Sequence, residues 1–177
     1  MLDKITNIKA IESKALFGVL VVVLLLANFL IVAKERTLAD GKLMLLELAP
    51  RDPRSILQGD YMVLRYRMAN QIARHSDELT EDGHVVVTLD SNSVAIFERI
   101  HNSATPLKEN ESLLLYRKRN GVVKLATNAF FFQEQHGKYY SAARYGDVRV
   151  SSGGDAVLTG LRDGKFRELK PEDSEDS

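Results

Sequence analysis

The stretch that decides the fold runs from Leu113 to Leu125 and reads LLLYRKRNGVVKL. Leu113–Lys118 and Val122–Leu125 are short runs rich in apolar, β-prone residues. Between them, Asn120-Gly121 is the dipeptide that most strongly favours a two-residue hairpin turn. The sequence therefore predicts a β-hairpin over residues 113–125.

Short runs of the same kind lie on both sides of this hairpin, with turn residues about every 8–12 positions, a spacing typical of all-β domains. The further predicted strands are His84–Leu89, Val94–His101, Ala129–Gln133, Tyr139–Ala143, Val148–Val150 and Ala156–Leu161, with Lys165–Leu169 as a candidate last strand. No long amphipathic helices alternate with them, which disfavours a parallel α/β sheet. We therefore expect a mainly β domain, either an antiparallel sandwich or a partly open barrel.

Residues Tyr61–Met68 show the period-two alternation of a half-exposed strand. Met62, Leu64, Tyr66 and Met68 alternate with Tyr61, Val63, Arg65 and Arg67. Residues on one face of a strand are two apart, so Leu64 and Tyr66 are expected to enter the core together, with Tyr61 on the opposite face. The polar segment Ala69–Asp82 that follows is expected to be a loop or a helical turn.

Composition excludes several classes of function. The chain has 177 residues, with 24 Lys+Arg and 24 Asp+Glu, so it offers no basic stripe for nucleic acid. It contains no cysteine, which excludes disulfides and thiol chemistry. The four histidines, at positions 75, 84, 101 and 136, lack metal-ligand spacing. We expect no metal and no cofactor.

The N-terminal segment Ala15–Ala33 reads ALFGVLVVVLLLANFLIVA, without a charged residue. A helix of this length spans about 28 Å, close to the hydrocarbon core of a bilayer. A soluble helix would carry a polar stripe, and a cleavable signal peptide usually has a shorter apolar region. The segment is therefore interpreted as an uncleaved transmembrane anchor.

The order of segments predicts four parts. Residues 1–14 form an N-terminal flank, 15–33 the anchor, 40–169 the β domain and 170–177 an acidic tail expected to be disordered. Lysine and arginine are balanced on the two sides of the span, so the positive-inside rule does not decide the orientation. We expect a single-pass protein of the inner (cytoplasmic) membrane, with its N-terminus inside and its domain outside, in the periplasm.

Residues 59–66 read GDYMVLRY and spell the pattern GDYxxLxY in full. On this octapeptide and its lead-in Asp52-Pro53-Arg54, the chain resembles the GDYXXLXY family of bacterial membrane-anchored proteins. Phe131–Glu134, Ala143–Gly146 and Val157–Leu161 are similar to the family's second half. The resemblance covers most of residues 40–165 and implies one N-terminal span with an outward-facing, β-rich domain. Some members occur with, or fused to, polytopic membrane proteins, and the family brings no established activity.

The motif admits a structural interpretation. Gly59 can adopt positive φ or allow close backbone approach, and Asp60 can accept hydrogen bonds from nearby backbone N–H groups. Tyr61, Leu64 and Tyr66 would then belong to a strand launched from this corner, with a tyrosine hydroxyl fixing a loop.

A binding interpretation stays open beside it. Arg51, Asp52, Arg54 and Arg144, with Asp60, would form a ligand or partner site. Three arginines can bind a carboxylate or phosphate through bidentate hydrogen bonds. This interpretation requires the arginines to converge.

Two functions follow from these alternatives. The first is a membrane-anchored, non-enzymatic accessory domain at the cell envelope, docked on a polytopic membrane protein or another envelope component. The second is a hydrolase with the architecture of signal peptidase I, which uses a Ser–Lys dyad, although no catalytic residue can be named from the sequence. A serine hydroxyl within hydrogen-bond reach of a buried lysine would favour the second function.

Overall fold

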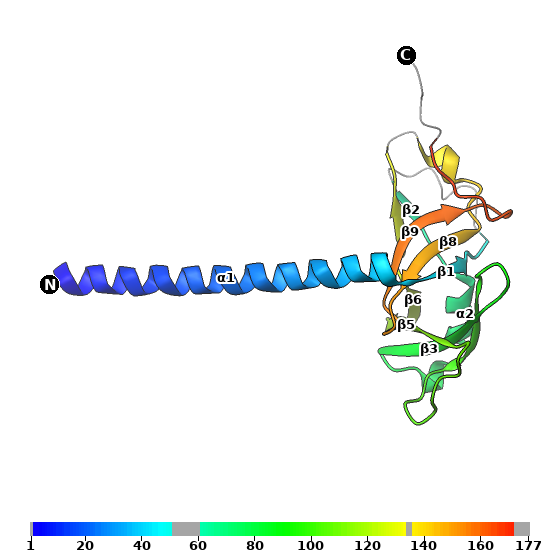
Figure 1. The fold of residues 1–177 in the computed structure, drawn as a ribbon, viewed down its shortest axis with the longest axis horizontal. Helices are drawn as coiled ribbons and strands as arrows, with labels where there is room; N and C mark the ends of the chain where they lie inside the picture. The colour runs from blue at the N-terminus through cyan, green and yellow to red at the C-terminus, as the bar shows by residue number, and fades with distance from the viewer. Residues whose placement is uncertain (1, 51–60, 134–135, 172–177) are drawn as a thin grey trace, which may run out of the picture. The chain divides into compact units, whose positions relative to one another are not determined.

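The computed structural model describes residues 2–50, 61–133 and 136–171. It divides the chain into two compact units, residues 1–36 and 37–177. The first unit is helical and the second contains the β domain, shown in Figure 1.

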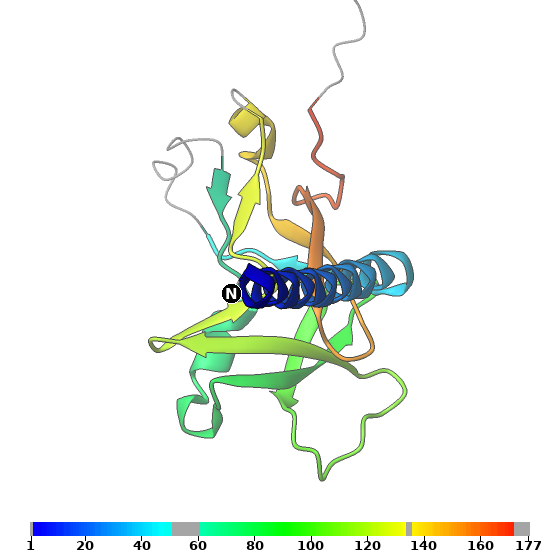
Figure 2. The ribbon, with the colours of Figure 1, turned by 90° about the vertical axis from the view of Figure 1, so that its left-hand side faces the viewer.

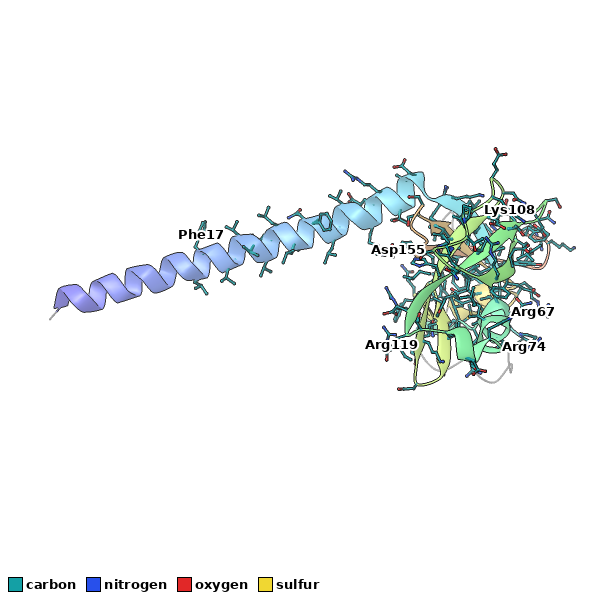
Figure 3. All side chains as sticks on the ribbon, turned by 90° about the horizontal axis from the view of Figure 1, so that it is seen from below. Phe17, Arg67, Arg74, Lys108, Arg119 and Asp155 are labelled. Carbon is teal, nitrogen blue, oxygen red and sulfur yellow. The ribbon has the colours of Figure 1, made fainter. Side chains whose placement is uncertain are left out.

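The helix α1 extends over Leu2–Asp40. Its described large apolar side chains point outward and are exposed, as Phe17 illustrates in Figure 3. Asn28 is the one polar side chain of the apolar run. Its amide nitrogen donates a hydrogen bond to the carbonyl oxygen of Leu24, one turn earlier in the same helix, at 2.9 Å. The part from Leu16 to Asp40 is long and apolar enough to cross a membrane, and a signal sequence would satisfy the same criteria.

The described strands of the domain form three antiparallel groups. The first sheet has the order β1 (Lys42–Glu47), β8 (Tyr145–Val150) and β9 (Ala156–Arg162), and these strands lie side by side in Figure 1. The second sheet has the order β4 (Ala95–Ile100), β3 (Asp82–Leu89), β5 (Ser112–Arg119) and β6 (Val122–Leu125). The third group pairs β2 (Tyr61–Val63) with β7 (Ala129–Phe131).

Three short helices lie in the described part of the domain. They are α2 (Arg67–Ala73) and the 3-10 helices η2 (Ser76–Glu78) and η3 (His136–Tyr140). Met68 and Ile72 of α2 are buried, one helical turn apart. Tyr140 of η3 packs against Phe130, with ring centroids 4.8 Å apart, which places η3 on the β2–β7 ribbon (Figure 2).

Single contacts join the groups into a curled half-barrel. The N–H of Leu45 in β1 donates to Ser93, just before β4, and the N–H of Leu115 in β5 donates to Gly154, in the turn between β8 and β9. Bulges at Val86/Val87 and Asp147/Val148 increase the local twist and help each sheet to curl. The predicted mainly β fold class is confirmed, in its partly open barrel form.

One apolar core serves all three groups. Its buried residues come from β1 to β6, β8 and β9, from α2 and η3, and from the connections that follow β1 and β2. They include Met44, Leu46, Met62, Leu64, Tyr66, Ile72, Val85, Leu114, Tyr116, Leu125, Val148 and Leu161. A two-stranded ribbon is at best marginally stable alone, so the β2–β7 pair depends on this shared core for its stability.

The predicted hairpin over residues 113–125 is confirmed. β5 and β6 pair in the register Arg119↔Val122, and the turn residues Asn120 and Gly121 have φ of 51° and 77°. These positive values are those of a type I′ turn, whose twist matches that of the flanking strands.

The prediction of a single strand over Tyr61–Met68 was wrong in its second half. The strand ends at Val63, Tyr66 makes only an isolated bridge to Leu48, and α2 begins at Arg67. The predicted burial of alternate residues nevertheless holds from Met62 to Met68. Residues four apart lie on the same face in a strand and also in a helix. The spacing of the apolar residues therefore did not reveal the change from strand to helix.

Two further strand predictions were wrong. Tyr139–Ala143 contains the end of η3, because Tyr140 turns inward to pack on Phe130 and Phe132. Lys165–Leu169 makes only an isolated bridge, Arg162↔Glu168. There the carboxylate of Asp163 accepts hydrogen bonds from the backbone N–H groups of Lys165 and Arg167, which holds a tight turn in place of a strand.

Candidate functional site

The structure divides the motif residues between core and surface. Leu64 and Tyr66 are buried, with 1% and 2% of their surface exposed, as their shared parity predicted. Tyr61 is 46% exposed. Gly59 and Asp60 lie outside the described residues.

Tyr66 has a clear structural role. Its hydroxyl donates to the carbonyl oxygen of Thr127 at 2.9 Å, in the loop between β6 and β7. Burial raises the pKa of this phenol well above its usual value, so it remains a neutral donor. The N–H of Leu64 donates to Asn128 of the same loop at 2.7 Å. The expected tyrosine hydroxyl that fixes a loop is thus provided by Tyr66.

The shared arginine site stays a prediction. Arg51, Asp52 and Arg54 lie outside the described residues, so their distance from Arg144 is not described. Arg144 itself has an exposed side chain. Its backbone connects β1 to the end of β9, since its carbonyl accepts from Leu48 and its N–H donates to Arg162.

An apolar surface occupies one face of the β2–β7 ribbon. Tyr61 pairs with Phe131 across the ribbon, with ring centroids 5.8 Å apart, and Val63 follows two residues later on the same face. Phe131 is 74% exposed and Val63 50% exposed. The opposite face carries Met62 and Phe130, which pack into or against the core. We call Tyr61, Val63 and Phe131 the ribbon face.

The ribbon face continues into a groove of about 460 Å³ between the end of β2 and the strand β6. Val122 of β6 is 56% exposed and adds to the apolar surface at the groove. The groove is lined by Val63, Leu64, Arg65, Tyr66, Ala69, Asn70, Val122, Val123, Lys124, Leu125 and Asn128. Its volume falls within the range of about 300–1,000 Å³ that is typical of ligand pockets.

The charge of this groove has one sign. Arg65 and Lys124 are exposed on its rim, and no carboxylate is among the lining residues. Within the described parts of the chain, neither cation has an ion pair. The nearby Arg67 differs, because it pairs with Glu47 at 2.9 Å.

Sequence reasoning missed this groove. Arg65 and Lys124 lie far apart in the chain, and only the half-barrel brings the segment after β2 and the strand β6 together around one groove. The available signal was the apolar character of Val63, at a position whose parity faced solvent.

The basic run Arg117-Lys118-Arg119 is largely engaged in structural contacts. Arg119 donates to both carboxylate oxygens of Asp82, at 2.9 and 3.0 Å, and its position is labelled in Figure 3. Lys118 donates to the carbonyl oxygen of Ser76 at 3.2 Å. These contacts hold the hairpin against the first residue of β3 and against η2, which precedes that strand.

A second cleft, of about 360 Å³, contains a serine and a lysine in contact. The ammonium of Lys42 donates to the hydroxyl of Ser112 at 3.1 Å. Lys42 is exposed, whereas a lysine that acts as a base in a Ser–Lys pair is desolvated to favour its neutral form. Among the described residues, no group of three or more His, Cys, Asp or Glu side chains could hold a metal ion.

Glu111 borders the same cleft and forms a two-bond ion pair with Arg99. Its two oxygens accept from Arg99 at 2.6 and 2.9 Å, and one also accepts the backbone N–H of Lys108. These hydrogen bonds, the bond from Arg99 foremost, lower the pKa of Glu111 from 4.5 to about 2. The pair fastens the loop before β5 to β4.

Comparison with known proteins identifies one family. The model of the family described as GDYXXLXY protein matches residues 23–161. No curated protein and no solved structure matches the chain.

We predict that Tyr66→Phe lowers the free energy of unfolding by about 1 kcal/mol, because it removes one hydrogen bond and leaves the Thr127 carbonyl without its donor. The measurement is thermal or chemical unfolding of the full-length protein in detergent. Tyr61→Phe is the matched control, since its side chain is exposed, and it should leave stability unchanged. Equal effects of the two substitutions would contradict the assigned role of Tyr66.

We also predict acid sensitivity from Glu111. A carboxylate with a lowered pKa in the folded state contributes stability above its unfolded pKa, and this contribution is lost as pH falls. The melting temperature should therefore fall between about pH 4.5 and pH 2, the two pKa values of Glu111. Glu111→Gln should lower the melting temperature at pH 7 and flatten the acid decline, and an unchanged acid decline in that variant would contradict the assignment.

Proposed function

Since the chain belongs to the GDYXXLXY family, we propose that it is a membrane-anchored, non-catalytic interaction protein of the cell envelope. In this proposal α1 holds the β domain at the outer face of the inner membrane, and the domain docks on a polytopic membrane protein. The observation that carries the proposal is the ribbon face, where Tyr61 and Phe131 are exposed side by side.

The ribbon face has the chemistry of an interaction surface. Aromatic side chains bury a large apolar area with little loss of conformational freedom, and they are enriched at the centres of protein interfaces. Here they adjoin the aliphatic side chains Val63 and Val122 and the cations Arg65 and Lys124. An apolar centre with a charged rim is the usual arrangement of a protein–protein contact.

The anchor is supported by the length and exposure of α1. Between Leu16 and Val32 its large apolar side chains have no packing partner sufficient to bury them. Exposing so much apolar surface to water is unfavourable, at about 25 cal/mol per Å², and a bilayer removes that cost. A span oriented with the N-terminus inside would place the domain in the periplasm.

A photo-crosslinking residue placed at position 131 tests the proposal in intact membranes. The membranes are first washed with alkaline carbonate, and we expect the full-length protein to remain in the pellet. Illumination should then give a discrete adduct with an integral membrane protein. The same residue at Ile96, which is 48% exposed on β4, serves as the control and should give no such adduct.

Other outcomes of this experiment contradict separate parts of the proposal. Release of the full-length protein by carbonate would reject the anchor, and recovery of a fragment beginning near Asp40 would establish cleavage. Similar adducts from positions 131 and 96, or none from either, would reject the ribbon face as the docking surface.

The hydrolase alternative rests on the contact between Lys42 and Ser112. We expect this serine to be unreactive, because the exposed lysine is solvated and poorly suited to act as a base. The measurement is labelling of the full-length protein with a fluorophosphonate probe, with Ser112→Ala as the control. Labelling that disappears in this variant would favour the hydrolase.

A further inference from the structure

The strand β6 has a free edge. Among the described residues it pairs only with β5. Arg119 and Val122 close a two-residue hairpin turn, and such a closing pair exchanges both of its hydrogen bonds. Bonded pairs alternate along an antiparallel ladder, so Val123 lies at a non-bonded position. Its backbone N–H and C=O therefore point away from β5, and the same parity applies to Leu125.

Two backbone hydrogen bonds of β5, one on each side of the strand, agree with this alternation. Lys118, the register partner of Val123, sends its N–H away from β6 to the carbonyl of Glu81. Leu115 has the opposite parity, and its N–H points to the β6 side, where it reaches Gly154 beyond the end of that strand. The hairpin turn at Gly154 thus covers the edge of β5, whereas no described backbone group bonds the outward edge of β6.

The groove lies along this free edge. Residues 63–66 form its other wall, and several of their backbone groups bond to other segments. Leu64 donates to Asn128, and the carbonyl of Arg65 accepts from Ala49. Hydrogen-bonding capacity inside the groove is therefore concentrated on β6. A strand added there would lie about 4.8 Å from β6, the normal spacing in a sheet.

Side chains around the edge specify the chemistry of the added strand. Val122 and Lys124 share the exposed face of β6, and each would lie beside a residue of the new strand. An apolar residue suits the first position and an acidic residue the second. Arg65, on the opposite wall, favours further negative charge.

We propose that this groove binds an extended, acidic–apolar segment of a partner protein, which adds to the free edge of β6 as a new strand. The inference rests on the proposed function and specifies how the docking site recognises its partner. Backbone hydrogen bonds to Val123 and Leu125 would provide affinity, and Lys124 with Arg65 would select acidic sequences. The ribbon face would be covered by the same partner where it continues past the groove.

Two other occupants fit the groove less well. A second copy paired through β6 would bring the cations Lys124 and Arg65 of the two chains together, and like charges on adjacent strands are destabilising. An anionic lipid surface would satisfy the cations but could not pair with the backbone of β6 inside a groove.

The test uses the full-length protein in neutral detergent and a fluorescent peptide of repeating Val-Thr-Glu-Thr, in which valine and glutamate alternate along one face of the strand. Fluorescence anisotropy is the readout. The peptide should bind, and its valine–lysine counterpart should not. Two further peptides carry N-methyl groups on the odd-numbered or on the even-numbered residues. Only one of them should lose binding, because only one set of N–H groups faces β6.

The double variant Arg65→Glu with Lys124→Glu should bind the glutamate peptide about tenfold more weakly and gain affinity for the lysine peptide. Its control, Arg74→Glu with Lys165→Glu, changes two exposed cations that do not line the groove and should bind as the unmodified protein does. Both substituted side chains are exposed, so the double variant leaves the buried side of β6 unchanged and should still fold.

Three results would overturn the inference. They are no binding of the glutamate peptide, binding that the charge swap leaves unchanged, and binding by both of the N-methylated peptides. A lipid occupant is tested by measuring how fast Lys124 is acetylated in nanodiscs of different lipids. Slower acetylation in phosphatidylglycerol than in phosphatidylcholine, together with no peptide binding, would assign the groove to anionic lipid headgroups. If the peptide fails while the adduct at position 131 persists, only this inference fails. Loss of both results would reject the proposed function as well.

Discussion

Burial of one shared apolar core is the constraint on which the rest of the domain depends. The described strands form groups of two, three and four, and only single contacts such as Leu45 to Ser93 connect them along the backbone. A closed barrel would hold itself together through a continuous ladder. Here the segment from Met62 to Met68 acts in its place, because its alternate side chains pack against residues from both larger sheets.

That arrangement also explains why the domain has an open side. The segment leaves β2, sends Tyr66 into the core and turns into α2, so it passes β6 without pairing with it. The result is a groove with a strand edge on one wall. Tyr66 fixes the other wall through its bond to Thr127, and the motif thereby shapes the groove through residues that do not reach the surface themselves.

Charge is distributed in a way that separates structure from recognition. The ion pairs with the most buried carboxylates, Arg99–Glu111 and Arg162–Asp147, fasten loops and strands within the domain. Exposed pairs contribute little to stability, since solvent and salt screen them. Arg65 and Lys124 take part in neither kind of pair among the described residues, which leaves their charge available to a partner. A balanced net charge therefore does not prevent one local surface from being basic.

The sequence by itself determined the local features of this protein. The apolar run of α1, the Asn120-Gly121 hairpin and the burial of Leu64 and Tyr66 follow from hydropathy, turn chemistry and parity, which act between near neighbours. Only the tertiary structure decided that the chain turns helical at Arg67, that Tyr140 folds inward and that Arg65 faces Lys124 across a groove. Each of these depends on packing between segments distant in sequence. Periodicity carries no information about such packing, because the same spacing of apolar residues satisfies more than one arrangement of the backbone.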